Sequence, residues 1–254
     1  MKRIFAILLV LLLVAAMTAC VAPTPTTTPG KTEPGTTTTP TTVPPTTVPP
    51  TTVPPTTVPP TTVPPTTAAP EKEEPFIGET VNNVYTNGFL GITCQLDAQW
   101  TVFNKEQLAQ LMGLTSDLMN NDAVENAMEN GTVVMAFYAQ SLDGTLNMNI
   151  ALERLSLANG ILMDEESYIN VSKSQLAPAL ESMGMENVTV ETAKIRFAGE
   201  ERYGLRIHGT IQGVDFDEAL VCIKNGNYIA SVTVGTVGEN KTDDLLAMFK
   251  RMGM

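Results

Sequence analysis

The spacing of apolar and polar residues divides the chain into three parts. Residues 4–14 are almost wholly aliphatic, residues 21–75 are dominated by threonine and proline, and residues 76–254 repeat apolar positions with the periods of strands and helices. The first run is too short for a transmembrane helix, which needs about 20 apolar residues. We therefore expect a cleaved signal at 1–19, a linker at 20–75 and one folded domain at 76–254.

Within the domain, alternation with period two predicts strands, and spacing of three to four residues predicts helices. The pairs Asn87-Gly88, Asp143-Gly144 and Asn225-Gly226 are typical of tight hairpin turns, so the strands on either side should be antiparallel neighbours. Two short strands are expected within 83–103, and others at 133–139, 146–153, 187–197, 201–212, 214–224 and 228–236. Helices are expected at 104–115, 122–129, 164–184 and 242–252.

Two of these helices carry specific expectations. Pro178 should kink or break its helix, because proline lacks the backbone N–H that continues the ladder. The last helix should begin with Thr242 as its cap, with acidic residues 243–244 at its positive end and basic residues 250–251 at its negative end. Its buried stripe is expected to be Leu245, Met248, Phe249 and Met252.

This order of elements predicts an α+β fold, preceded by a disordered linker. We expect an antiparallel sheet of about six to eight strands with helices packed on both faces, an α/β/α sandwich. The order resembles the PsbP-like fold of a photosystem subunit, a Ran-binding import factor and many bacterial lipoproteins. The resemblance spans about Asn82 to Met252 and is carried by residues 85–91, Trp100, the turn 197–200 and residues 205–232. It implies a fold and no shared ligand or reaction.

The residues before the linker indicate how the protein is delivered. Lys2 and Arg3 precede the aliphatic run, and small residues precede a lone cysteine. Residues 17–20, Met-Thr-Ala-Cys, resemble the lipobox of bacterial lipoproteins, although Met17 replaces the usual leucine. The resemblance implies that Cys20 is lipidated and tethers the protein to the extracytoplasmic face of the cell membrane. The alternative is an ordinary secretory signal cut near Ala19, with Cys20 an incidental thiol.

The linker repeats the unit Thr-Thr-Val-Pro-Pro five times between residues 41 and 65. Proline prevents helix and sheet ladders, and the segment has too little apolar surface to form a core. It should behave as a semi-stiff spacer with a rise of about 3.1 Å per residue. We interpret it as a stalk; glycosylation of its threonines and recognition of its Pro-Pro pairs remain alternatives.

The formal net charge of −12 bears on partners. An acidic surface repels nucleic acid and anionic lipid headgroups, and it favours cations or basic partners. The membrane, through the lipid on Cys20, and an unidentified protein or cell-wall component are therefore the expected partners. Trp100, the only tryptophan, should close one end of the core, with exposure as a binding anchor as the alternative.

Candidate chemistry is sparse. His208 is the only histidine, which excludes a multi-histidine zinc site, and no nucleophile elbow accompanies it. Cys94 and Cys222 should be buried free thiols, although a secreted protein could join them in a disulfide. The thirteen methionines are interpreted as core filler. Two groups could bind Ca²⁺ weakly, but neither has the spacing of a calcium loop: Asp215, Asp217 and Glu218, and Asp143, Asn147 and Asn149.

No catalytic residue, cofactor site or metal site is therefore predicted. The function expected is a lipoprotein that presents a non-enzymatic binding or assembly domain on a stalk. The alternatives are a cell-wall hydrolase with paired carboxylates and a purely structural surface protein.

The lipid anchor generates a direct prediction. Cys20→Ala should release the protein from membranes, because the thioether on Cys20 is the only expected attachment. Fractionation of cells into membrane and soluble parts measures this, and a variant retained as strongly as the wild type would contradict it.

Overall fold

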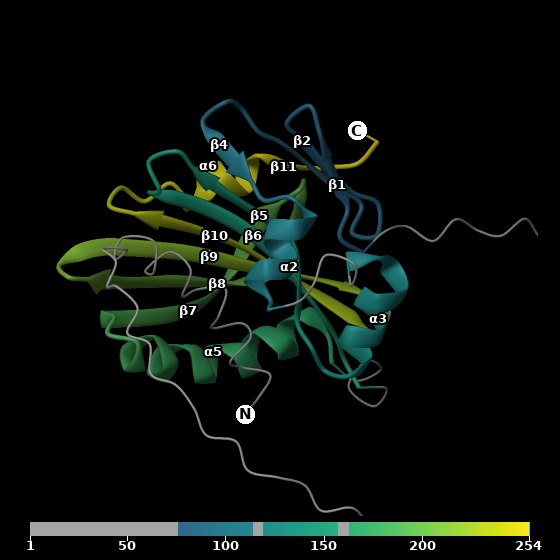
Figure 1. Ribbon diagram of the computed structural model, residues 1–254. Coiled ribbons are helices and arrows are strands. Elements are labelled where there is room, and N and C mark those ends of the chain that lie inside the picture. The colour runs from purple at the N-terminus through teal and green to yellow at the C-terminus, as the bar shows by residue number, and fades with distance from the viewer. Residues whose placement is uncertain (1–75, 114–118, 157–162, 254) are drawn as a thin grey trace, which may run out of the picture. The chain divides into compact units, whose positions relative to one another are not determined.

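The computed structural model of the chain describes residues 76–113, 119–156 and 163–253 (Figure 1). It shows an α+β fold in which two antiparallel sheets carry most of these residues. No helix in the described ranges is long and apolar enough to cross a membrane. The predictions for the signal, for Cys20 and for the linker concern positions outside the described residues.

The larger sheet has seven strands in the order β4-β5-β6-β10-β9-β8-β7, all antiparallel to their neighbours. Short turns connect β5 to β6 and each successive pair from β7 to β10, which confirms the expected antiparallel sheet. The strands are β4 (Trp100–Val102), β5 (Val134–Ser141), β6 (Leu146–Arg154), β7 (Glu186–Phe197), β8 (Glu200–Ile211), β9 (Val214–Asn225) and β10 (Tyr228–Val237).

A second sheet of four strands has the order β1-β2-β3-β11. The hairpin between β2 and β3 was predicted, but its membership of a separate sheet was not, so the expectation of a single sheet was wrong. Its strands are β1 (Glu79–Val81), β2 (Val84–Asn87), β3 (Ile92–Gln95) and β11 (Phe249–Arg251).

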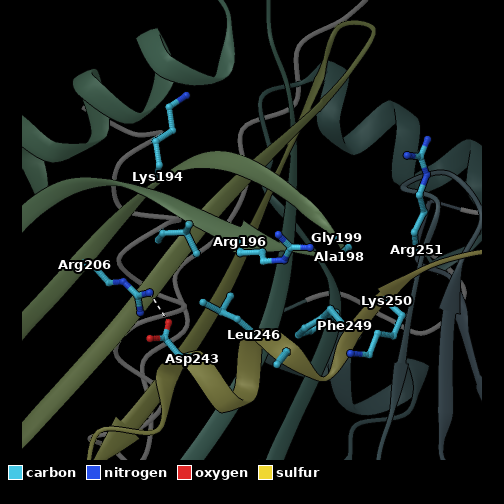
Figure 2. A pocket seen from close by; sticks show the side chains of 12 residues that line it. Lys194, Arg196, Ala198, Gly199, Arg206, Asp243, Leu246, Phe249, Lys250 and Arg251 are labelled. Carbon is cyan, nitrogen blue, oxygen red and sulfur yellow. Dashed lines mark hydrogen bonds and ion pairs between the residues drawn. The ribbon is translucent and has the colours of Figure 1, made fainter.

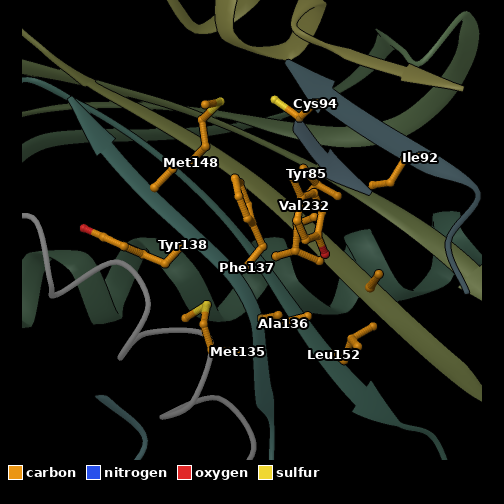
Figure 3. Packing of buried hydrophobic residues seen from close by; sticks show 14 of the residues in the cluster. Tyr85, Ile92, Cys94, Met135, Ala136, Phe137, Tyr138, Met148, Leu152 and Val232 are labelled. Atoms are coloured by element: carbon orange, nitrogen blue, oxygen red, sulfur yellow. The ribbon is translucent and has the colours of Figure 1, made fainter. Parts of the chain in front are cut away.

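The two faces of the large sheet enter two different cores. On one face Phe137 stacks on Tyr85 of the small sheet, with ring centroids 4.2 Å apart. On the other face Leu220 packs in a cluster with Leu176 of α5 (Glu165–Ser182). Figure 3 shows Tyr138 pointing away from Tyr85, as alternation along a strand requires. The large sheet therefore packs against helix α5 on one face and against the small sheet on the other. The expected layer of helices on both faces is not shown.

Helix α5 begins and ends as its sequence predicts. The side chain of Asp164 accepts a hydrogen bond from the backbone N–H of Ser167, and Gly184 follows the helix with a φ of +91°. The predicted break at Pro178 was wrong, because the helix continues through it. Pro178 is exposed, so water can satisfy the carbonyl that its missing N–H leaves unpaired.

The two helices before β5 are α2 (Lys105–Leu111) and α3 (Asn121–Glu129). Asn104 caps α2 in a reciprocal capping box with Gln107, as predicted. Trp100 lies in β4 and packs against the main core, as expected, although its side chain is only half-buried.

The C-terminal prediction needs the largest correction. Helix α6 (Thr242–Ala247) has only six residues, and the chain then forms β11, which pairs with β3. Thr242 does not cap it: Lys241 holds the cap position, and the Thr242 hydroxyl donates to Asn240. A strand is favoured here because it supplies a partner for β3 and buries Phe249 among the rings of Phe137 and Phe197.

The start of the domain is held by buried polar groups. The Asn87 side chain donates to the carbonyl of Phe76 at 2.9 Å, and the Tyr85 hydroxyl donates to that of Ile77 at 3.0 Å. The Phe76 ring packs between Phe89 and Tyr228, with centroids 4.8 and 5.2 Å away. Phe76, the first described residue, is therefore fixed to the domain by its ring and by its backbone carbonyl.

This attachment predicts how the chain tolerates truncation. A chain that begins at residue 74 should melt within about 1–2 °C of one that begins at Val21, because it keeps every contact of Phe76. A chain that begins at Glu79 loses two buried side chains, at roughly 3–5 kcal/mol, and should melt roughly 6–20 °C lower. Thermal unfolding measures both. Equal melting points for all three chains would show that residues 76–78 contribute nothing.

Candidate functional site

Positive charge gathers in one open cleft with a volume of about 650 Å³. The walls come from the end of β7, the turn to β8, α6 and β11 (Figure 2). Such a concentration contrasts with the formal net charge of −12 of the whole chain. The basic residues that line the cleft are Lys194, Arg196, Arg206, Lys250 and Arg251.

One wall depends on a tight turn. Ala198 and Gly199 both have positive φ, at 47° and 87°, and they connect the register partners Phe197 and Glu200. Two-residue hairpin turns require this left-handed conformation at both positions, and glycine adopts it without steric cost. The turn follows Phe197, the last residue of β7, so Arg196 lines the cleft from the position just before the strand ends.

The opposite wall depends on β11. Phe249 is buried opposite Cys94 of β3, whereas Lys250 and Arg251 are exposed. Both side chains line the cleft, and Arg251 reaches the end of the β7–β8 turn, where it pairs with Glu200.

Most of the cations already have partners. Arg206 donates to the Thr242 hydroxyl at 2.9 Å and pairs with Asp243, while Arg251 pairs with Glu200 at 2.6 Å. Arg196 and Lys250 are exposed and form no ion pair within the described residues. These two side chains are therefore the ones most available to a bound anion.

Lys194 contributes less to the cleft than its place on the wall suggests. Its ammonium nitrogen lies 3.0 Å from the ring centroid of Tyr203, a cation–π contact. In Figure 2 its side chain points away from Asp243 and Leu246. We therefore exclude it from the group of available cations.

The floor of the cleft is apolar. Ile195, Leu246 and Phe249 line it and are buried in the main core. Cations around an apolar floor suit a ligand that joins an anionic group to an apolar one. The lining therefore provides positive charge and apolar surface for binding. Its one acidic residue, Asp243, already forms an ion pair with Arg206.

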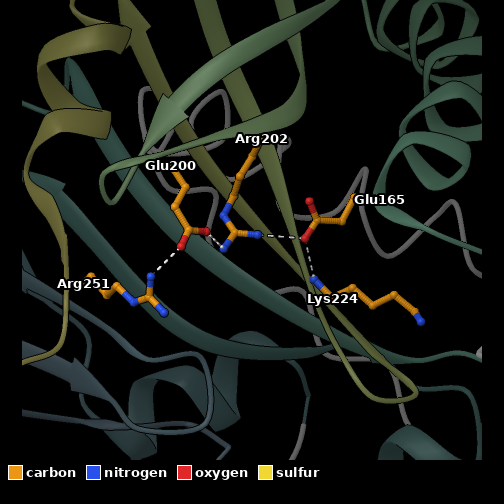
Figure 4. A network of polar contacts seen from close by, with 5 residues as sticks. All are labelled: Glu165, Glu200, Arg202, Lys224 and Arg251. Atoms are coloured by element: carbon orange, nitrogen blue, oxygen red, sulfur yellow. Dashed lines mark hydrogen bonds and ion pairs between the residues drawn. The ribbon is translucent and has the colours of Figure 1, made fainter.

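A chain of polar contacts supports the cleft from behind (Figure 4). Arg251 pairs with Glu200, Glu200 pairs with Arg202 at 2.8 Å, and Arg202 pairs with Glu165 at 2.8 Å. Glu165 also accepts from the backbone N–H of Lys224 at 2.9 Å. The chain links β11 to the first turn of α5; its exposed members add little stability, but they orient Arg251.

His208 lies in a smaller cavity of about 280 Å³ beside the cleft. Its Nδ1 is 3.0 Å from Asp217 Oδ1 on the neighbouring strand. Thr242 lines the same cavity, but its hydroxyl accepts from Arg206 and donates to Asn240. The structure therefore pairs His208 with an acid, while the nearest lining hydroxyl of α6 is committed elsewhere.

The acidic groups considered for Ca²⁺ do not converge. Asp217 and Glu218 point to opposite faces of β9, because Asp217 contacts His208 and Glu218 is buried on the side of Ile207. Asp143 accepts from Ser141 and Thr145 within its own turn. Among the described residues no group of three or more His, Cys, Asp or Glu side chains could hold a metal ion.

Asn147 and Asn149, the other members of that second group, are buried inside β6. They lie on the face of the sheet that carries Glu218, as the register of β6, β10 and β9 shows. Both asparagines lie in the strand that was expected at 146–153, which is confirmed, but their burial was not foreseen.

Cys94 and Cys222 are free and buried, as predicted. They lie in the two different cores, on opposite faces of the large sheet, which explains why no disulfide joins them. Burial raises the pKa of the Cys94 thiol to about 12 and raises the pKa of the Cys222 thiol further still. Neither thiol is therefore reactive at neutral pH.

Sequence reasoning missed the basic cleft. It assigned Lys250 and Arg251 to a helix end, which removed them from any site. One signal could have revealed the cleft: of the eleven basic residues between 76 and 254, eight lie after residue 193. That clustering is unusual in an acidic chain and indicates a local positive surface.

No protein-family model matches the chain, and no curated protein matches it in sequence. Among solved structures, a protein from Bacteroides thetaiotaomicron VPI-5482, determined at 1.50 Å resolution, is similar with a TM-score of 0.32 and 10% identity. The similarity covers 66% of this chain and 48% of that one, so it spans about half the length of the other protein.

Proposed function

We propose that this protein is a lipid-anchored extracytoplasmic lipoprotein that presents a non-enzymatic binding domain on a Thr/Pro-rich stalk, and that its basic cleft binds an anionic ligand. The observation that carries the binding role is the pair Arg196 and Lys250. Both lie on the walls of the cleft without an ion pair to a described residue. The lipobox resemblance of residues 17–20 supports the anchor.

The charge distribution favours the cleft as the place where an anion binds. Acidic surface elsewhere repels an anion, while the cleft attracts it, so binding is directed to one place. Arg196 offers a planar fork that matches two oxygens of a phosphate or carboxylate. The Phe249 ring and the aliphatic side chains of Ile195 and Leu246 form a floor that suits an adjoining apolar group. The preferred ligand is therefore an anion with an apolar extension.

The hydrolase alternative has less geometric support. The two buried carboxylates of the large sheet are Glu153 and Glu218. Their register partners, Ile229 and Gly235, are six residues apart on β10, or about 20 Å. Paired-carboxylate glycosidases separate their acids by about 5–9.5 Å. The other alternative is a purely structural surface protein, whose cleft would bind no ligand. The binding experiment described next distinguishes this alternative from the proposed binding role.

The full chain should bind octyl phosphate more tightly than inorganic phosphate, because only the former occupies both the cations and the apolar floor. Arg196→Ala together with Lys250→Ala should weaken octyl phosphate binding at least about tenfold, since charge-assisted contacts contribute about 1.5–3 kcal/mol each. Isothermal titration calorimetry at low and high salt measures both, and affinity should fall as salt rises.

The matched control is Lys105→Ala together with Lys173→Ala, which removes the same charge from two exposed helix positions. It should bind octyl phosphate within about twofold of the wild type. If the cleft variant binds as well as this control, or if wild-type affinity is independent of salt, the cleft is not the anion site.

A further inference from the structure

Strand β7 forms one edge of the large sheet, and it is the longest edge strand of the two sheets. It has twelve residues, whereas the edge strands β1, β4 and β11 have three residues each. Natural proteins usually shorten an exposed edge or interrupt it with proline or a bulge, because an open edge pairs readily with a further strand. From Thr189 to Phe197 the register of β7 is continuous, and no proline interrupts it.

The β7–β8 turn fixes which backbone groups of β7 point away from the sheet. Phe197 and Glu200 flank a two-residue turn, and residues in that position exchange both backbone hydrogen bonds. Hydrogen-bonded and non-hydrogen-bonded pairs alternate along an antiparallel ladder, so every second residue of β7 bonds to β8. The residues between them point their backbone N–H and C=O groups outward, and we call them the outward row: Val190, Thr192, Lys194 and Arg196.

The outward row has no backbone partner among the described residues. Val190 is half-buried in the cluster under α5, whereas Thr192, Lys194 and Arg196 are exposed. Water satisfies backbone groups at an exposed edge, and an added strand can replace that water with a ladder of hydrogen bonds. The edge from residue 192 to residue 196 is therefore open to an extended polypeptide.

This open part of the edge borders the basic cleft (Figure 2). Lys194 and Arg196 both line the cleft, and Ile195 between them belongs to its apolar floor. A strand added to β7 would lie about 4.8 Å from it and would alternate its side chains between the two faces of the sheet. Every second side chain of that strand would point to the face of Ile195, which is the face that carries the cleft.

We propose, resting on the anion site proposed above, that the anionic ligand is an acidic segment of another protein that binds in extended form along β7. Its backbone pairs with the outward row, and its carboxylates contact Arg196 and Lys250. An apolar side chain of the segment lies on the floor of the cleft. Segments that add a strand to a sheet edge gain affinity from backbone hydrogen bonds and specificity from alternate side chains. The cations of the cleft select an acidic segment over a basic one.

A second copy of this chain fits the open edge less well. Each copy has a formal net charge of −12, so two copies repel each other when they approach. An acidic segment of another protein needs only enough charge to match Arg196 and Lys250.

The probes are acetyl-Asp-Glu-Phe-Thr-Val-Thr-Val-amide and the reversed peptide acetyl-Val-Thr-Val-Thr-Phe-Glu-Asp-amide. They bring their acids to the cleft in the antiparallel and the parallel orientation, respectively. At least one should bind the full chain with a Kd of about 100 μM or tighter in isothermal titration calorimetry. Replacing its two acids by asparagine and glutamine should weaken binding at least about tenfold. Arg196→Ala together with Lys250→Ala should weaken the peptide and octyl phosphate alike.

Strand pairing is tested by removing one outward N–H group. Thr192→Pro removes an N–H that β8 does not use, so the edge strand tolerates it and Tm should fall by less than about 5 °C. It should weaken peptide binding at least about tenfold and leave octyl phosphate binding within about twofold, because Thr192 does not line the cleft. The matched control, Thr192→Ala, keeps the N–H and should bind the peptide within about twofold of the wild type.

Methylated peptides make the same test on the unaltered protein. N-methylation of both threonines blocks one edge of the peptide, and N-methylation of both valines blocks the other edge. One of these two forms should lose binding at least about tenfold and the other should keep it, because only one edge of the peptide faces β7. These peptides decide the matter if Thr192→Pro fails to fold.

Binding of octyl phosphate without binding of either peptide would overturn this inference and leave the proposed anion site intact, whereas binding of neither would overturn both. Two methylated forms that bind equally well, or equally poorly, would show that no strand forms along β7. Sedimentation that reveals a dimer of the chain, dissociated by Thr192→Pro, would assign the edge to a second copy and would likewise overturn the inference.

Discussion

The pairing of β11 with β3 is the contact on which both the core and the cleft depend. It completes the small sheet, buries Phe249 at 1% exposure and brings that ring within 5.2 Å of Phe197 and 6.4 Å of Phe137, measured between centroids. Rings in such tilted and edge-on arrangements contribute beyond the area that they bury. The same strand carries Lys250 on its exposed side. The pairing of β11 with β3 therefore both completes the small sheet and forms one wall of the charged cleft.

Basic residues are concentrated in one cleft of an otherwise acidic chain, and this distribution supports the proposed binding role. The chain as a whole is acidic and repels other anions, yet its last part concentrates basic residues where β7, α6 and β11 meet. The opposite face of the sheet carries neutral polar groups at Asn149 and Glu218. A basic cleft on an acidic chain suits a domain that binds an anionic partner, with the proposed stalk and anchor setting its distance from the membrane.

The sequence predicted local structure well where short-range chemistry decides it. The cap at Asn104, the hairpin turn at Asn87-Gly88 and the four long C-terminal strands depend on residues a few positions apart, and all were confirmed. It failed where distant contacts decide. Residues 249–251 have helical spacing, but an open edge at β3 makes a strand more favourable. The cleft could not be assembled without that pairing, and the burial of Asn149 could not be foreseen without the register of β6.

The central claim, that β11 and the β7–β8 turn form one anion site, is tested most directly by nuclear magnetic resonance. Amide chemical shifts of the full chain are followed during titration with octyl phosphate. The account predicts that the amides of residues 196–199 and of residues 250–251 shift together and saturate with a single Kd. Shifts confined to one of these segments, or two segments that saturate with different Kd values, would contradict it.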